Sequence, residues 1–180
     1  MEEHVKRIGR KLVYKGNILD FYEDDILTPK GKVAHWDFIG HKGAAAVVAV
    51  AEDGKLVMVR QYRNALDRET LEIPAGARNY VGEPTIDCAI RELREETGYT
   101  ASSMEYLMTL RTAIAYCDEL IDIYVATGLV KGEQELDEDE VVEVVEMPID
   151  ELCSMVYDGK LQDAKTVAAI MAYKNKITSK

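Results

Sequence analysis

Short stretches of alternating or continuous apolar residues recur along the chain and predict several β-strands. Partial alternation over residues 10–22 predicts one strand, and residues 24–37 predict a hairpin that turns at residues 30–32. The continuous apolar run at residues 43–51 (GAAAVVAVA) predicts a buried strand. Residues 55–62 (KLVMVRQY) are its expected partner, because the Glu-Asp-Gly sequence between the two runs suits a hairpin turn.

The second half of the chain mixes both kinds of element. Further strands are expected at residues 70–73, 103–112, 120–126 and 141–145. Helices are expected at residues 148–157 and 160–174, and a third within residues 83–99. The order of these elements predicts an α+β fold in a single domain.

The third predicted helix carries the most informative charge pattern. Glu92, Glu95 and Glu96 are related by spacings of three and four, so they fall within about 100° of one another on a helical wheel. Like charges at this spacing repel, and a hard divalent cation bound through oxygen offsets the repulsion. A solvated charged face is the alternative for such a run. The apolar residues on the arc expected to face the core are Ile86, Ala89, Ile90 and Leu93.

Composition narrows the class of protein. A chain of 180 residues with 47% hydrophobic and 31% charged residues suits one globular domain. Its net charge of −11 disfavours a general nucleic-acid or anionic-membrane binder, since there is no basic surplus. The three cysteines are odd in number and far apart, which favours a reducing compartment over a disulfide framework. No signal peptide or membrane-spanning apolar run is visible, so a cytoplasmic location is expected.

Three features around the charged helix give it a context. A Pro-Ala-Gly turn ends at Gly76, Glu83 stands eight residues before Arg91, and Gly98 follows the helix as a C′ glycine. The pattern resembles the Nudix box, and every position from Glu83 to Tyr99 matches it. One spacing differs, because six residues separate Gly76 from Glu83 where the family has five. The resemblance implies the Nudix fold, a mixed β-sheet sandwiched between helices, and hydrolysis of a phosphoanhydride.

The resemblance also implies a metal site and a division of the chain. Glu92 and Glu96 would be the principal ligands, with Glu95 close by and the carbonyl of Ala75 completing the set. The expected cofactor is Mg²⁺ or Mn²⁺, because carboxylates on one helix face suit a hard cation. Residues 1–180 would form one Nudix hydrolase domain. Within it, residues 1–40 would be an N-terminal strand extension used in dimerisation, and residues 41–180 the core.

Arg91 and Glu83 have roles implied by the same resemblance. Arg91 lies four residues before Glu95, so it can pair with a box carboxylate and hold its rotamer. The alternative for Arg91 is a plain surface ion pair. Glu83 would contact Arg91, and its alternative is a carboxylate favoured by the positive end of the helix.

The general base is expected outside the helix. In the family branch that acts on ADP-ribose, the base often lies on a loop between the last strands, and the acidic run at residues 136–140 (LDEDE) occupies that place. Glu140 has the best register, with Glu138 and Asp139 as rivals. The alternative is a solvated acidic loop. Glu140, Glu95 and Arg91 are thus the residues assigned to catalysis.

The ADP-ribose pyrophosphatase branch resembles this chain in further segments. These are the N-terminal strand region, residues 59–63 (VRQYR), residues 72–76 (EIPAG) and residues 163–166 (DAKT). Arg63 would contact the substrate diphosphate, unless it pairs with a structural carboxylate such as Glu72. Trp36 would stack on adenine, unless it is a core residue. Tyr116 and Glu72 complete the predicted substrate-binding set.

Two departures concern the substrate. Residues 113–116 (AIAY) replace the branch's Ser-Pro-Gly-aromatic, and His41 stands where some members carry a basic residue that reaches across a dimer. The expected reaction is Mg²⁺-dependent hydrolysis of ADP-ribose or a similar nucleoside diphosphate sugar to a nucleoside monophosphate and a sugar phosphate. Alternatives are another Nudix substrate (GDP-mannose, a dinucleotide or a nucleoside triphosphate) and a non-catalytic nucleotide-sensing module. A homodimer with exchanged N-terminal strands is expected, with no nucleic-acid or membrane partner.

Overall fold

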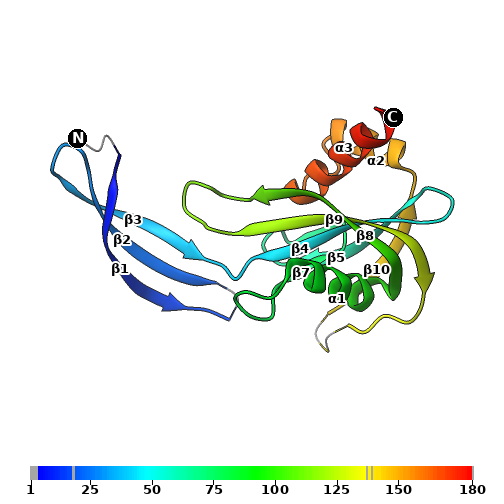
Figure 1. Ribbon diagram of the computed structural model, residues 1–180, viewed down its shortest axis with the longest axis horizontal. Coiled ribbons are helices and arrows are strands. Elements are labelled where there is room, and N and C mark those ends of the chain that lie inside the picture. Colours follow the sequence, from blue (N-terminus) through cyan, green and yellow to red (C-terminus); the bar gives the residue numbers. More distant parts are fainter. Residues whose placement is uncertain (1–3, 18, 137, 139, 180) are drawn as a thin grey trace.

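The computed structural model describes residues 4–17, 19–136, 138 and 140–179, which form two β-sheets flanked by three helices (Figure 1). The strands of the first sheet are β1 (Lys6–Lys15), β2 (Asp20–Leu27) and β3 (Val33–Gly40). Those of the second are β4 (Ala44–Val50), β5 (Leu56–Arg63), β6 (Arg68–Glu72), β7 (Ala75–Ala77), β8 (Tyr99–Arg111), β9 (Leu120–Lys131) and β10 (Val142–Met147). The helices are α1 (Thr85–Thr97), α2 (Ile149–Tyr157) and α3 (Ala164–Thr178).

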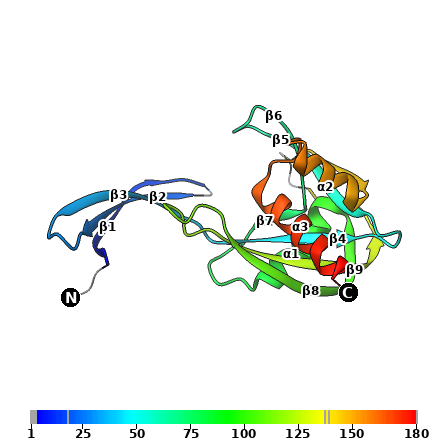
Figure 2. The ribbon, with the colours of Figure 1, turned by 90° about the horizontal axis from the view of Figure 1, so that it is seen from above.

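The N-terminal sheet stands away from the rest of the molecule (Figures 1 and 2). Its three strands pair antiparallel in the order β1-β2-β3. The single strand expected over residues 10–22 is wrong: the chain reverses there, and the Gly16 amide donates to the Leu19 carbonyl at 2.9 Å. The hairpin expected over residues 24–37 is confirmed as β2–β3, and Gly31 takes a φ of 74° in its turn.

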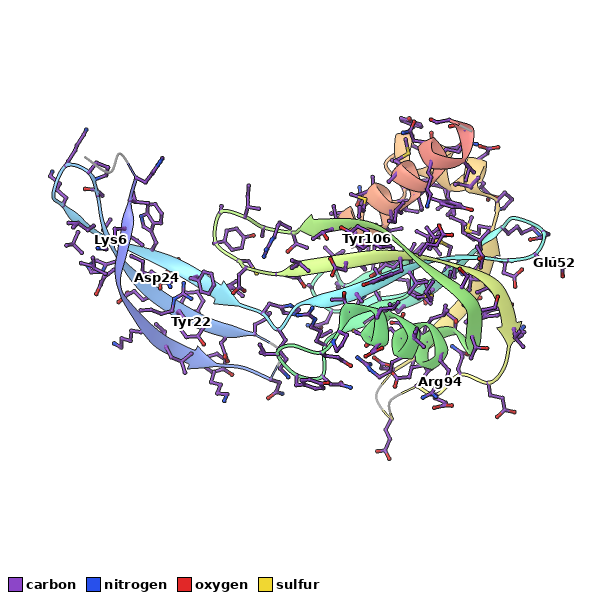
Figure 3. The ribbon with its side chains drawn as sticks, viewed as in Figure 1. Lys6, Tyr22, Asp24, Glu52, Arg94 and Tyr106 are labelled. Atoms are coloured by element: carbon purple, nitrogen blue, oxygen red, sulfur yellow. The ribbon has the colours of Figure 1, made fainter. Side chains whose placement is uncertain are left out.

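An ion pair consolidates this small sheet. Arg10 donates from Nε and Nη2 to the two carboxylate oxygens of Asp24, both at 2.6 Å, and Asp24 is buried. The guanidinium carbon lies 3.6 Å from the ring centre of Phe38. Figure 3 shows Asp24 and Tyr22 in this sheet, far from Arg94 on α1. Because few apolar side chains are buried here, this paired charge and stacked ring supply much of the local packing.

The second sheet has strands in the order β10-β5-β4-β9-β8, with β6 beside β5 and β7 beside β4. The β4–β9 pair is parallel and the other described pairs are antiparallel, so the sheet is mixed. β4 is buried on both faces: alternate residues pack toward two separate clusters of core side chains. α1 covers one face and α2 with α3 the other (Figure 1), which confirms the mixed sheet between helices.

Two details of the helices correct the sequence prediction. Ile86 and Ile90 are 38% and 49% exposed, so the buried apolar residues of α1 are Cys88, Ala89 and Leu93. α3 begins after residue 163 rather than at residue 160, because the side chain of Asp163 accepts from the Thr166 amide as an N-cap. The predicted end of α1 is confirmed: Gly98 has a φ of 74° and donates to the Arg94 carbonyl at 2.8 Å.

None of the helices in the described ranges is both long and apolar enough to cross a membrane.

Candidate active site

The carboxylates of α1 are buried rather than presented to solvent. Glu92 is 8% exposed and Glu96 5%, and they lie on the helix face that packs toward β4 and β7. Glu96 accepts a hydrogen bond at Oε2 from the Ala75 amide at 2.8 Å. Burial raises the pKa of Glu92 to about 7 and that of Glu96 to about 8. The solvated-face alternative is therefore wrong for these two residues, and their surroundings only partly compensate the cost of burying their charged forms.

Gly76 lets the backbone approach these carboxylates closely. A Cβ atom placed there would lie 2.1 Å from the Glu92 carboxyl carbon and 2.2 Å from both of its oxygens. β7 keeps a regular antiparallel register with β4, pairing Ala75 with Ala46. The extra residue between Gly76 and Glu83 is therefore accommodated beyond β7. There the Asn79 amide donates to Glu83 at 2.7 Å and Gly82 takes a φ of 93°.

Arg91 organises the cluster from one side. Its Nη1 donates to Glu92 at 2.5 Å and to Glu95 at 2.9 Å, and its Nη2 donates to the Ala77 carbonyl at 3.0 Å. The buried Glu83 carboxylate lies 3.8 Å from its Nε, which agrees with the expected contact. With 22% of its side chain exposed, Arg91 makes more than the plain surface ion pair considered as the alternative.

The donor set suits a divalent cation in chemistry, although the side chains do not converge on one point. Within the described ranges, no three His, Cys, Asp or Glu side chains form a group that could hold a metal ion. The reason is visible in the contacts, since Arg91 draws Glu92 and Glu95 while Glu96 turns to the Ala75 amide. Two buried carboxylates with raised pKa values are nevertheless the hard oxygen ligands that such a cation would neutralise.

The segment after β9 runs back along the end of α1. Gln134 donates from Nε2 to the Glu96 carbonyl at 2.7 Å and to the Val142 carbonyl at 3.2 Å. Arg94, labelled in Figure 3, pairs with Glu135 at 3.1 Å and ties the same segment to the helix. These contacts hold Gln134 and Glu135 at the end of the helix that carries the carboxylates.

Glu140 is exposed, and its negative charge contributes to the raised pKa values of Glu92 and Glu96. Its rival Glu138 is also exposed, whereas Asp139 lies outside the described residues. Of the residues predicted for catalysis, the structure thus brings Arg91 and Glu95 into direct contact and places the charge of Glu140 within electrostatic reach.

Two clefts meet near the carboxylates of α1. The smaller, about 380 Å³, is lined by β7 together with His41, Glu119 and other residues. The larger, about 740 Å³, lies along β5 and β6 and has Leu66 and Met155 among its apolar walls. Both clefts share one set of charged residues: Arg63, Asp163 and Lys165.

Glu72 anchors that shared wall. Arg63 donates to its two oxygens from Nε and Nη2, both at 2.6 Å, so the pairing considered as the alternative for Arg63 is present. Lys165 binds the same carboxylate, and Thr70 donates to it at 2.7 Å. These partners outweigh the effect of burial and lower the pKa of Glu72 to about 2. Sequence reasoning noted the DAKT segment but missed Lys165, whose only signal was a basic residue at a helix start.

The remaining predicted substrate residues lie toward the N-terminal sheet. Trp36 is 48% exposed on β3, so the core alternative is wrong, and β3 stands apart from α1 (Figure 2). Tyr116 lies on the loop between β8 and β9, where its carbonyl accepts from the Ile39 amide at 2.7 Å. His41 is not free to reach outward, since 6% of its side chain is exposed and its Nδ1 lies 3.5 Å from Glu119.

Comparisons with known proteins agree with this geometry. A family model described as NUDIX domain matches residues 40–170. A methanol dehydrogenase activator of Bacillus methanolicus and an ADP-ribose pyrophosphatase of Bacillus subtilis (strain 168) are each 38% identical over 167 residues, which cover 92% of this chain and 90% of each relative. A crystal structure of an ADP compounds hydrolase superimposes with a TM-score of 0.84 at 22% identity, covering 97% of this chain and 95% of that one.

Proposed function

This chain belongs to the NUDIX domain family, and from that premise we propose that it hydrolyses the pyrophosphate bond of ADP-ribose or a similar nucleoside diphosphate sugar. Water adds across one P–O bond of the diphosphate, and the products are a nucleoside monophosphate and a sugar phosphate. One observation carries the proposal. Buried carboxylates with raised pKa values lie beside a cleft whose other wall presents Arg63. A diphosphate bound there would need a metal cation between its oxygens and the carboxylates, and a basic side chain such as Arg63 to neutralise its remaining charge.

Mg²⁺, or Mn²⁺ in its place, is the proposed cofactor. Glu92 and Glu96 would hold it, with Glu95 and the Ala75 carbonyl nearby, through carboxylate oxygens that Arg91 does not contact. When bound, the cation neutralises diphosphate charge and lowers the pKa of a bound water. Arg91 then acts as a positioning residue that limits the rotamers of Glu92 and Glu95.

Glu140 is the proposed general base. It is exposed, so its carboxylate is free to accept a proton from water, and its charge already influences Glu92 and Glu96. Gln134, which precedes Glu140 in the same segment, donates to the Glu96 carbonyl and so attaches that segment to the end of α1.

Arg63, Glu72 and Tyr116 are the proposed contacts to the substrate within one chain. Trp36 joins them only from a second copy, because its own β3 lies away from its own α1 (Figure 2). A homodimer that exchanges N-terminal strands would bring the tryptophan to the partner's cleft. It would also cover a set of exposed apolar residues: Val5, Ile8, Leu12, Val13, Tyr14, Leu19 and Val33.

Light scattering after size-exclusion chromatography tests the dimer. We expect a mass of about twice the 20.2 kDa of one chain. A monomer at all concentrations would remove Trp36 from the substrate site.

A cytoplasmic location is also proposed, since the three cysteines are free thiols in the described structure.

A screen with Mg²⁺, in which the products are separated and identified by chromatography, tests the reaction and the substrate. The substrates are ADP-ribose, other nucleotide sugars including GDP-mannose, NADH, diadenosine polyphosphates and nucleoside triphosphates, with Glu96→Gln as the inactive control. We expect the highest kcat/KM on ADP-ribose or a related sugar. Activity on none of these compounds would refute the proposal that the protein is an enzyme. Activity chiefly on nucleoside triphosphates would refute the proposed substrate class.

A further inference from the structure

We propose that Lys165, in the first turn of α3, is a second phosphate-binding cation that acts with Arg63 on the substrate diphosphate. The proposal rests on the proposed function and assigns part of its substrate site. It follows from where the ammonium group is held, what remains free on the two cations, and how near they lie to the carboxylates of α1.

Lys165 is held in place before any ligand arrives. Only 11% of its side chain is exposed, and its Nζ donates to Glu72 and, at 2.9 Å, to Asp163. Asp163 is fixed in turn, because it also accepts from the amide and the hydroxyl of Thr166 at 3.1 and 2.6 Å. A lysine with its rotamer already restricted loses little conformational entropy when it binds an anion.

The two cations retain donors for a ligand. Arg63 uses Nε and Nη2 for Glu72, which leaves Nη1 with both of its hydrogens. Lys165 has three N–H donors and uses two of them for the carboxylates. Both side chains line the smaller cleft at β7 and the larger cleft beside it. An anion lying across the junction of the clefts would therefore meet both.

A short stretch of backbone connects this pair to the carboxylate helix. The Ile73 amide donates to Thr166 Oγ1 at 3.0 Å, and two residues later the Ala75 amide donates to Glu96 at 2.8 Å. The strand end thus lies between α3 on one face and α1 on the other.

A purely structural role is the competing explanation. Glu72 is buried, and Lys165 could serve only to neutralise it together with Arg63. The bidentate pair with Arg63 already balances that carboxylate, so a lysine kept for this purpose alone would be redundant. A Glu72→Gln background separates the two explanations. If Lys165 only neutralises Glu72, replacing it there should no longer change the Kd of an anion; if it binds phosphate, the Kd should still rise.

The test is calorimetric titration in EDTA, where no turnover occurs, with inorganic pyrophosphate and ADP-ribose as probes. Lys165→Met should weaken the binding of both probes, raising Kd by about 10-fold or more, because it removes a charge-assisted hydrogen bond to phosphate. Lys165→Arg should stay within about 3-fold, since it keeps the charge. Lys160→Met is the matched control: Lys160 lines the larger cleft and pairs with Asp158, and it makes no recorded contact with Glu72. It should change the Kd by less than about 2-fold.

The same comparison is repeated in a Glu72→Gln background, with the melting temperature of every variant measured. A loss of 10-fold or so from Lys165→Met in that background supports the proposal. A loss that disappears there, or an unchanged Kd in the native background, overturns it. If Lys165→Met does not fold, Lys165→Gln in the Glu72→Gln background decides by the same criterion. Binding of pyrophosphate that depends on Lys165, without hydrolysis of any nucleotide sugar, would refute the proposed function and leave this subsite standing.

Discussion

Replacing Gly76 by alanine tests whether close backbone approach sets the position of Glu92. The added Cβ would lie 2.2 Å from the Glu92 carboxylate oxygens, which is about 1.2 Å short of ordinary van der Waals contact. β7 is paired with β4, so the backbone resists movement and the carboxylate has to move instead. It then leaves the position where Arg91 holds it at 2.5 Å.

The expected effect on activity is large and the effect on stability small. A misplacement of about 1 Å in a catalytic constellation costs roughly 100-fold in rate, so kcat should fall by about that factor. Loss of the Arg91–Glu92 contact should cost about 1–2 kcal/mol, or about 2–8 °C in melting temperature for a chain of this size. Steady-state kinetics on the preferred nucleotide sugar and a thermal melt measure the two effects.

Gly54→Ala is the matched control. Gly54 has a φ of 82° and its added Cβ meets nothing within 4 Å, so alanine there costs about 1–2 kcal/mol through the backbone alone. Activity should be unchanged. If Gly76→Ala acts through Glu92, then Gly76→Ala/Glu92→Gln should be no slower than Glu92→Gln. Wild-type kcat in Gly76→Ala, or full additivity in the double variant, would refute the reasoning.

Three other predictions concern the charged groups. Glu140→Gln should lower kcat by about 10-fold or more without changing the melting temperature, because Glu140 is exposed; unchanged turnover would remove it from the mechanism. The folded-state pKa of Glu72, about 2, lies below its ordinary 4.5, so its stabilisation is present above pH 4.5 and is lost as the pH falls toward 2. The wild type should therefore exceed Glu72→Gln in unfolding free energy by roughly 3 kcal/mol at pH 6 and approach it at pH 2–3, and a pH-independent gap would contradict this. For Glu92 and Glu96 the folded-state pKa values are raised to about 7 and 8, so in EDTA the protein should lose stability as the pH rises from 4.5 to 8. Mg²⁺ should then raise the melting temperature more at pH 8.5 than at pH 6, because it binds the deprotonated carboxylates, and an equal shift at both would argue against these ligands.

Local sequence was most informative where one element contains the whole signal. The helix at residues 85–97 could be predicted because its carboxylates, its arginine and its terminal glycine lie within one stretch of chain. The run at residues 43–51 likewise identified β4, since a strand buried on both faces needs apolar residues at every position. The turn before residue 20 was missed because partial apolar alternation continues through both strands, although the Gly16-Asn17 pair between them suits a hairpin turn.

Side-chain environment could not be predicted in the same way. Ile86 and Ile90 were expected in the core, but the sheet meets α1 on the side of Cys88 and Leu93. The wheel gave the angular spacing of Glu92 and Glu96 correctly, yet it could not say that this arc faces β7 and is buried. Arg63 had two possible partners, and the pairing with Glu72 became visible only once β5 and β6 were side by side.

The sequence by itself determined the carboxylate-rich helix, the close-approach glycine segment before it and the mixed order of strands and helices. Those features depend on spacing within a few turns of chain, which covalent geometry fixes. The tertiary structure alone decided that Glu92 and Glu96 are buried, that Lys165 joins Arg63 at the junction of two clefts, and that β3, which carries Trp36, lies away from α1. Burial, pKa and ion pairing depend on neighbours brought from distant segments, such as α3 against Glu72, and no local pattern specifies them.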